Sequence, residues 1–167
     1  MLRYFRVWLL FMKTAVIREM EFRANFFAWM IINLAWMGFT VSFFWVIYGH
    51  TDTIGGWDAN QLMVLLGTFF CMEFFVWTFG YPNLGRISTY VNKGELDFFL
   101  LKPINPQFHV SLRRFSPHNT ASLVPAIGML LIGLRGMGLT LSLGQMLLYA
   151  LLFVAGLFIF YSLWFMS

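Results

Sequence analysis

Charge is scarce in this chain. Only 11% of its 167 residues are charged, whereas 60% are hydrophobic, and that balance lies far outside the range of soluble globular domains. A lipid bilayer is therefore the expected solvent. The formal net charge of +4 does not indicate nucleic acid, because the basic residues form no stripe interleaved with polar sequence. We expect no nucleic-acid partner.

Residues that carry chemistry are equally sparse. Cys71 is the single cysteine and lies in an apolar run, so no internal disulfide can form and a small buried hydrophobe is expected. The three histidines are too scattered for a zinc motif, and none lies beside an evident nucleophile. No Walker sequence occurs that could hold nucleotide phosphates. We therefore expect no enzyme, no metal site, no catalytic residue and no cofactor in this chain.

Four long apolar runs are present instead. Each has a length typical of a membrane-spanning helix, about 17–25 residues at about 1.5 Å per residue. The predicted spans are residues 24–48, 61–81, 118–134 and 143–165. We place the exit of the second span at Pro82 and expect the third to kink near Pro125. The sequence thus predicts an all-α polytopic membrane protein, with residues 1–167 forming a single transmembrane domain.

Residues 1–23 precede the first span and are amphipathic at helical spacing. Apolar residues such as Trp8 and Met12 fall on one side, while Arg6 and Lys13 fall on the other. Such a helix can lie in the membrane interface, although the same pattern suits a cytosolic helix packed on another subunit. Glu19 interrupts the apolar side, so we expect the chain to turn before the first span.

The basic residues are distributed unevenly between the loops. Five precede the first span, none lies between spans one and two, five lie between spans two and three, and Arg135 alone lies between spans three and four. The positive-inside rule then places the N-terminus and the loop between spans two and three in the cytoplasm. We expect a multi-pass protein of the cell (inner) membrane.

Residues 84–103 form the most charged stretch of the chain. Within it, Leu84, Ile87 and Val91 recur at helical spacing, which predicts a short amphipathic helix. Gly94 follows where a left-handed cap is favoured. The apolar face would anchor this helix while its charges set the register against a soluble partner. The alternative is a solvated loop whose basic residues only set topology.

The order of these parts resembles the permease subunits of ABC-2 type exporters. The specific likeness is the run Gly94-Glu95-Leu96-Asp97 followed by Phe98 to Pro103, which is similar to the Gly-x-Leu-Asp-x-x-Leu-x-(Lys/Arg)-Pro motif of an uncharacterised bacterial ABC-2 branch. The rest of the likeness is one of topology. Since that family has six spans, we expect the chain, which stops after about four at Ser167, to be a C-terminal truncation or fragment.

The resemblance implies a non-catalytic subunit that dimerises with a second permease, as a homo- or heterodimer, and docks a cytoplasmic ABC ATPase that binds ATP and Mg. It also implies that residues 84–103 act as the coupling region. The residues assigned to partner binding there are Arg86, Ile87, Val91, Gly94, Glu95, Leu96, Asp97, Leu100, Lys102 and Pro103.

Glu73 leaves a second function open. It lies within the second span, where a carboxylate at the bilayer centre costs about 2.5–3.5 kcal/mol and should face the protein interior. It is a possible intramembrane polar site, either bonded to a neighbouring helix or serving transport. An ion-coupled carrier or channel component that uses Glu73 is therefore one alternative to the exporter, and a membrane scaffold without transport is another.

Overall fold

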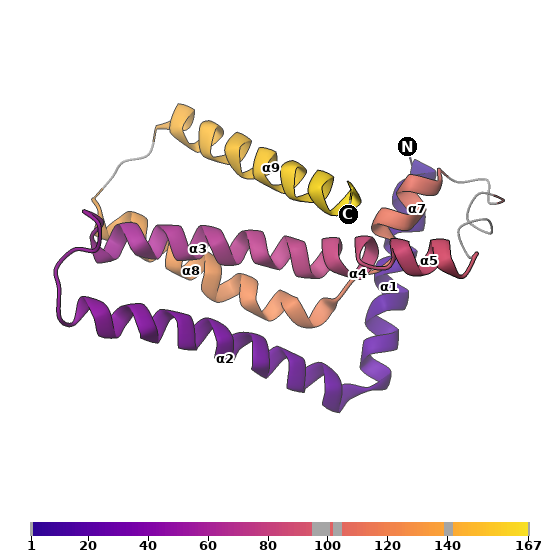
Figure 1. The fold of residues 1–167 in the computed structure, drawn as a ribbon, viewed down its shortest axis with the longest axis horizontal. Coiled ribbons are helices and arrows are strands. Elements are labelled where there is room, and N and C mark those ends of the chain that lie inside the picture. The colour runs from indigo at the N-terminus through magenta and orange to yellow at the C-terminus, as the bar shows by residue number, and fades with distance from the viewer. Residues whose placement is uncertain (1, 95–100, 102–104, 139–141, 167) are drawn as a thin grey trace.

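The computed structural model describes residues 2–94, 101, 105–138 and 142–166. Its regular elements over these residues are helices, apart from one isolated bridge between Ile54 and Trp57. Figure 1 shows the long helices lying side by side. Four helical runs are long and apolar enough to cross a membrane: Arg23–Tyr48, Ala59–Asn92, Pro117–Gly136 and Leu143–Leu163. The predicted all-α polytopic fold is confirmed.

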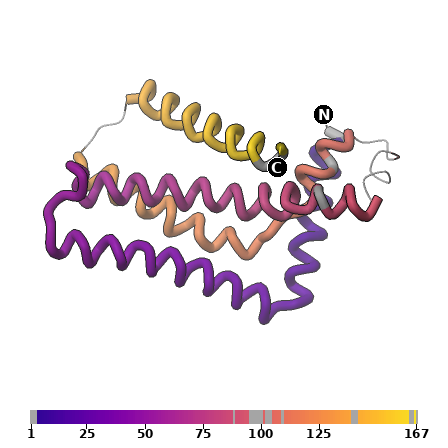
Figure 2. The backbone as a smooth tube through the Cα atoms, in the orientation of Figure 1, coloured from indigo at the N-terminus to yellow at the C-terminus, as the bar shows by residue number. Residues whose placement is uncertain are grey.

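Helix α1 (Leu2–Glu21) meets α2 (Arg23–Tyr48) at Phe22, whose φ of −111° and ψ of 63° are not helical. The chain therefore turns before the first span, as predicted. Figure 2 shows α1 crossing the end of the bundle while α2 runs along its length. We call this end, where α1 meets the other helices, the α1 end of the bundle.

The second membrane-spanning run begins with a strong cap. The Asp58 side chain accepts a hydrogen bond from the backbone N–H of Gln61 at 2.8 Å, and the Gln61 side chain accepts one from the Asp58 N–H at 3.0 Å. This capping box satisfies N–H groups that the first turn leaves free. Helix α3 (Ala59–Phe75) therefore starts two residues before the predicted span.

Pro82, where the second span is predicted to leave the membrane, does not end the helix. Helix α3 continues through a π-helical turn, η1 (Val76–Gly80), into α4 (Tyr81–Leu84) and, after a turn at Gly85, into α5 (Ile87–Asn92). Pro82 lies in the first turn of α4, where the fixed φ of proline suits a helix. The second span and the start of the predicted coupling region are thus one bent helical rod.

The chain returns through α7 (Pro106–Leu112) and a 3₁₀ turn, η2 (Pro117–Asn119), into α8 (Thr120–Gly136). Asn105 caps α7, since its Oδ1 accepts the N–H groups of Gln107 and Phe108 at 2.9 and 3.3 Å. Pro125 lies inside α8 and does not end it. Helix α9 (Leu143–Met166) follows.

Helices α3 and α8 pack closest, and glycine makes this possible. A Cβ atom on Gly67 of α3 would lie 2.8 Å from the backbone nitrogen of Leu130 and 2.9 Å from the carbonyl oxygen of Ala126, both in α8. Gly133 of α8 approaches the α3 backbone equally closely. Small residues allow such backbone contact, which drives helix association in lipid.

Helix α9 lies against the outer side of α3 (Figure 1). Tyr149 of α9 shares a hydrogen bond of 2.9 Å with Thr68, and Phe153 meets the ring of Phe75 at 5.9 Å. Ser111 of α7 bonds Tyr161 at 2.8 Å. These polar contacts lie at both ends of α9, so α9 is joined to α3 and also to the α1 end of the bundle.

Candidate functional site

The described part of the predicted coupling region lies at the α1 end of the bundle. Helix α5 carries Ile87 and Val91, with Arg86 immediately before it and Gly94 just after it. Gly94 has a φ of +65°, so the predicted left-handed cap is confirmed. The other residues assigned to partner binding lie outside the described residues: Glu95, Leu96, Asp97, Leu100, Lys102 and Pro103.

Helix α5 is anchored to the rest of the protein through Tyr90. Tyr90 is 6% exposed and packs with Val110 of α7 and with Ile87, whereas Val91 is 55% exposed. Helix α7 thus covers α5 from the side on which Tyr90 lies and leaves Val91 of the predicted apolar face exposed. Val91 and the exposed Arg86 are therefore available for contact with a partner.

Hydrogen bonds of Asn83 join this region to the second span. Asn83 is 1% exposed; its Nδ2 donates to the carbonyls of Phe79 and Arg114 at 2.7 Å each, and its Oδ1 accepts the Arg114 N–H at 2.7 Å. Arg114 Nε in turn donates to Tyr90 Oη at 3.1 Å. The end of the second span, helix α5 and the segment leading to the third span are thus joined by one continuous set of hydrogen bonds.

Because residue 82 is a proline, two backbone carbonyls of the π turn are bonded by residues from another part of the chain. Proline has no N–H, so Pro82 cannot bond the carbonyl four residues back, on Thr78, or the one five back, on Trp77. Both carbonyls accept donors from the segment before the third span: Thr78 O from the Ser116 N–H at 3.2 Å, and Trp77 O from Asn119 Nδ2 at 3.0 Å. Freed backbone groups in a membrane helix must find such partners.

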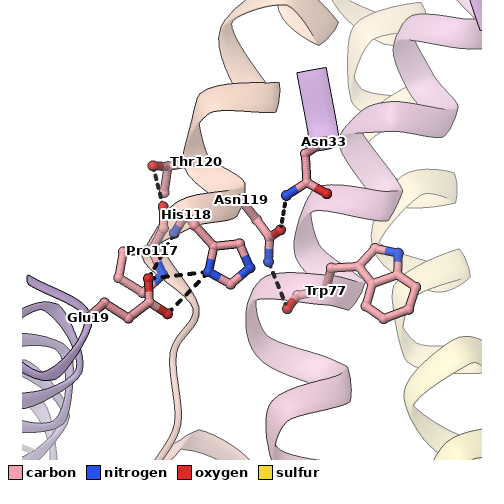
Figure 3. A network of polar contacts seen from close by, with 7 residues as sticks. All are labelled: Glu19, Asn33, Trp77, Pro117, His118, Asn119 and Thr120. Carbon is pink, nitrogen blue, oxygen red and sulfur yellow. Dashed lines mark hydrogen bonds and ion pairs between the residues drawn. The ribbon is translucent and has the colours of Figure 1, made fainter. Parts of the chain in front are cut away.

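Asn119 also reaches the first span. Its Oδ1 accepts a hydrogen bond from Asn33 Nδ2 at 2.8 Å, so its two amide atoms join α2 to η1 (Figure 3). The side chain is 7% exposed. All three of the first membrane-spanning runs therefore meet at one buried amide.

Helix α1 joins the same junction through Glu19. Its carboxylate lies 3.2 Å from His118 Nδ1 and accepts the His118 N–H at 3.3 Å (Figure 3). His118 belongs to the 3₁₀ turn that opens the third span. Glu19, which interrupts the apolar face of α1, thus makes a contact that joins α1 to the bundle.

Glu73 lines a cleft between α2 and the α3–η1–α4 rod. The cleft has a volume of about 870 Å³, and its walls include Trp29, Trp36 and Trp77. Trp77 lies one helical turn after Glu73 and lines the same cleft. Glu73 therefore faces the protein, as its membrane depth predicts, and it lies beside open space.

Among the described residues, no group of three or more histidine, cysteine or acidic side chains could hold a metal ion. The arrangement can transmit movement from one helix to another. A displacement of α5 would pull on Asn83 and the π turn, and through Asn119 it would reach α2 and α8. Sequence reasoning missed Asn33, Asn83 and Asn119, although an asparagine in an apolar span signals an interhelical hydrogen bond.

A family model described as "ABC-2 family transporter protein" matches residues 34–167. The match includes the second, third and fourth membrane-spanning runs and the whole predicted coupling region. Comparison with curated proteins and with solved structures gave no match.

Proposed function

The chain belongs to the ABC-2 family of transporter proteins, and on that premise we propose that it couples ATP hydrolysis in a separate cytoplasmic subunit to export. It is a multi-pass permease component of an ABC exporter. We further propose that it lies in the inner membrane with its N-terminus in the cytoplasm, and that it functions as a dimer with a second permease. The partner ATPase would supply ATP and Mg.

The joint between α5 and the second span carries this proposal. A soluble motor can move membrane helices only if it pushes on an element rigidly joined to them. Helix α5 is such an element because Asn83 and Arg114 bind its base to two spans. Its outer side presents Val91, 55% exposed, and the charged Arg86 directly precedes its first residue. An apolar contact flanked by charge is typical of a docking site.

Association with the ATPase tests the proposal. The gene next to this one is expected to encode a protein with a Walker motif, and the two proteins are expected to co-purify when co-expressed. A charge-reversed α5 surface, Arg86→Glu with Val91→Asp, should weaken association at least tenfold while membrane insertion is unchanged. Arg135→Glu is the matched control, because Arg135 is exposed in the last turn of α8 and lies outside the predicted coupling region.

Changing Leu96 and Asp97 should give the same loss, as the motif resemblance predicts. Association that survives both sets of changes would show that the ATPase docks elsewhere. Loss in the Arg135→Glu control alone would point to the opposite end of the bundle.

Glu73 supports a second candidate, the ion-coupled carrier, because its carboxylate lines a cleft in the membrane-spanning region. This candidate predicts pH-dependent flux in proteoliposomes without any ATPase, abolished by Glu73→Gln. The exporter predicts flux only when the ATPase and ATP are present.

A further inference from the structure

The cleft beside Glu73 combines an apolar wall with a cationic end. Trp29, Ile32 and Trp36 of α2 form one wall, and Phe70 and Phe74 of α3 lie on the other. Trp29 and Trp36 are 48% and 60% exposed. With a volume of about 870 Å³, the cleft falls within the usual size range of small-ligand sites, about 300–1,000 Å³.

Three arginines line the same cleft, and each comes from a different element at the α1 end of the bundle. Arg18 lies in the last turn of α1, Arg86 lies between α4 and α5, and Arg114 lies before η2. Arg86 follows Glu73 by about three to four helical turns along the α3–α5 rod. The cationic end is therefore well separated from the carboxylate.

We propose that this cleft binds an anionic amphiphile whose headgroup is a phosphate without a quaternary ammonium group, as in phosphatidic acid. Guanidinium groups bind phosphate oxygens in pairs of parallel hydrogen bonds, and arginine is favoured for phosphate recognition for this reason. The headgroup would lie among Arg18, Arg86 and Arg114, and the hydrocarbon tail would lie along the tryptophan wall. By the positive-inside assignment, the arginines stand at the level of the cytoplasmic leaflet, whose lipids supply such headgroups.

The charge balance favours an anion over an organic cation. Glu73 is the single carboxylate that lines the cleft among the described residues. A second carboxylate, that of Glu19, lies 3.2 Å from Nδ1 of His118, which also lines the cleft. The three arginines outnumber these two carboxylates, and the excess of positive charge attracts a phosphate and repels a quaternary ammonium group.

Competitive lipid binding tests the site without any ATPase, so its outcome is separate from that of the proposed function. The full chain, purified in a non-ionic detergent, is given equal amounts of phosphatidic acid and phosphatidylcholine, and the retained lipids are counted by native mass spectrometry. At least tenfold more phosphatidic acid is expected to bind. In the double variant Arg18→Gln with Arg86→Gln, the ratio of bound phosphatidic acid to bound phosphatidylcholine should fall by at least five-sixths.

The matched control is Arg6→Gln with Arg135→Gln. It removes the same two charges from exposed positions that do not line the cleft, so it should keep the preference. An equal loss in this control would mean general attraction to the surface and would overturn the proposal. Equal binding of the two lipids by the unmodified chain would overturn it as well.

Two further probes distinguish a lipid ligand from free phosphate and from an organic cation. Glycerol phosphate carries the headgroup without a tail, and it should fail to displace phosphatidic acid at the same concentration. Displacement would show a site for free phosphate and would refute the amphiphile. Dodecyltrimethylammonium should bind more weakly than phosphatidic acid; tighter binding that is lost in Glu73→Gln would assign the cleft to organic cations instead.

Discussion

Asn119→Ala is the substitution that most directly tests the junction between the first three spans. It removes the hydrogen bond from Asn33 Nδ2, of 2.8 Å, and the bond to the Trp77 carbonyl, of 3.0 Å. The Trp77 carbonyl then has no donor at Pro82, because proline carries no N–H. The substitution therefore leaves the Trp77 carbonyl without its donor, in addition to removing the bond from Asn33.

The magnitude follows from these losses. Hydrogen bonds between membrane helices contribute about 0.6 kcal/mol on average and up to about 1.7, while an unsatisfied buried acceptor costs about 1–3 kcal/mol. Water can reach part of the site through the cleft, which Asn119 lines, so the total should fall at about 1.5–3 kcal/mol of unfolding free energy.

Reversible unfolding in mixed detergent micelles, followed by circular dichroism, measures this change. Asn92→Ala is the matched control, since Asn92 is exposed at the end of α5 and its loss should cost less than about 0.5 kcal/mol. A double-mutant cycle with Asn33→Ala should give a coupling energy of about 0.5–1.5 kcal/mol. An Asn119→Ala protein as stable as the control, or a coupling energy near zero, would refute this account of the junction.

The helix contact and the topology give further tests. Gly67→Ala should destabilise the protein by about 1–3 kcal/mol, because the new Cβ meets the α8 backbone. Gly128→Ala is the control and should be neutral or stabilise the protein by up to about 1 kcal/mol, since no atom lies within 4 Å of the new Cβ. Equal effects of the two substitutions in a denaturation assay would disprove close packing of α3 and α8. For topology, cysteines are introduced at Val91 and Thr53, both exposed, in a Cys71→Ala background. An impermeant thiol reagent added to intact cells should label Thr53→Cys and leave Val91→Cys unlabelled, and the reverse result would invert the proposed orientation.

Much of the fold follows from hydrophobic runs alone. In a bilayer, backbone polar groups must be paired within the segment, so a charge-free run of the required length becomes a helix whatever its neighbours are. For this reason the first span was predicted to within one residue of α2 (Arg23–Tyr48). The left-handed Gly94 could be predicted for a similar reason, because the preference belongs to the residue itself.

Local sequence did not identify the contacts that another part of the chain supplies. The helix continues past Pro82, the predicted exit of the second span, because Ser116 and Asn119, more than thirty residues later, supply donors to the carbonyls that proline leaves free. Tyr90, which does not belong to the predicted apolar face, is the residue of α5 on which α7 packs. Neither partner could be identified from local spacing, since helical periodicity gives a face but does not give its neighbour.

The membrane character of the chain, its helical class, its approximate spans and its resemblance to ABC-2 permeases were all determined by sequence, because each depends on composition or on a contiguous motif. The three-span junction at Asn119, the α1 contact through Glu19 and the cleft that brings Arg18, Arg86 and Glu73 together were decided only by tertiary structure. Each of these brings together residues far apart in the chain, and their proximity depends on how the helices pack against one another.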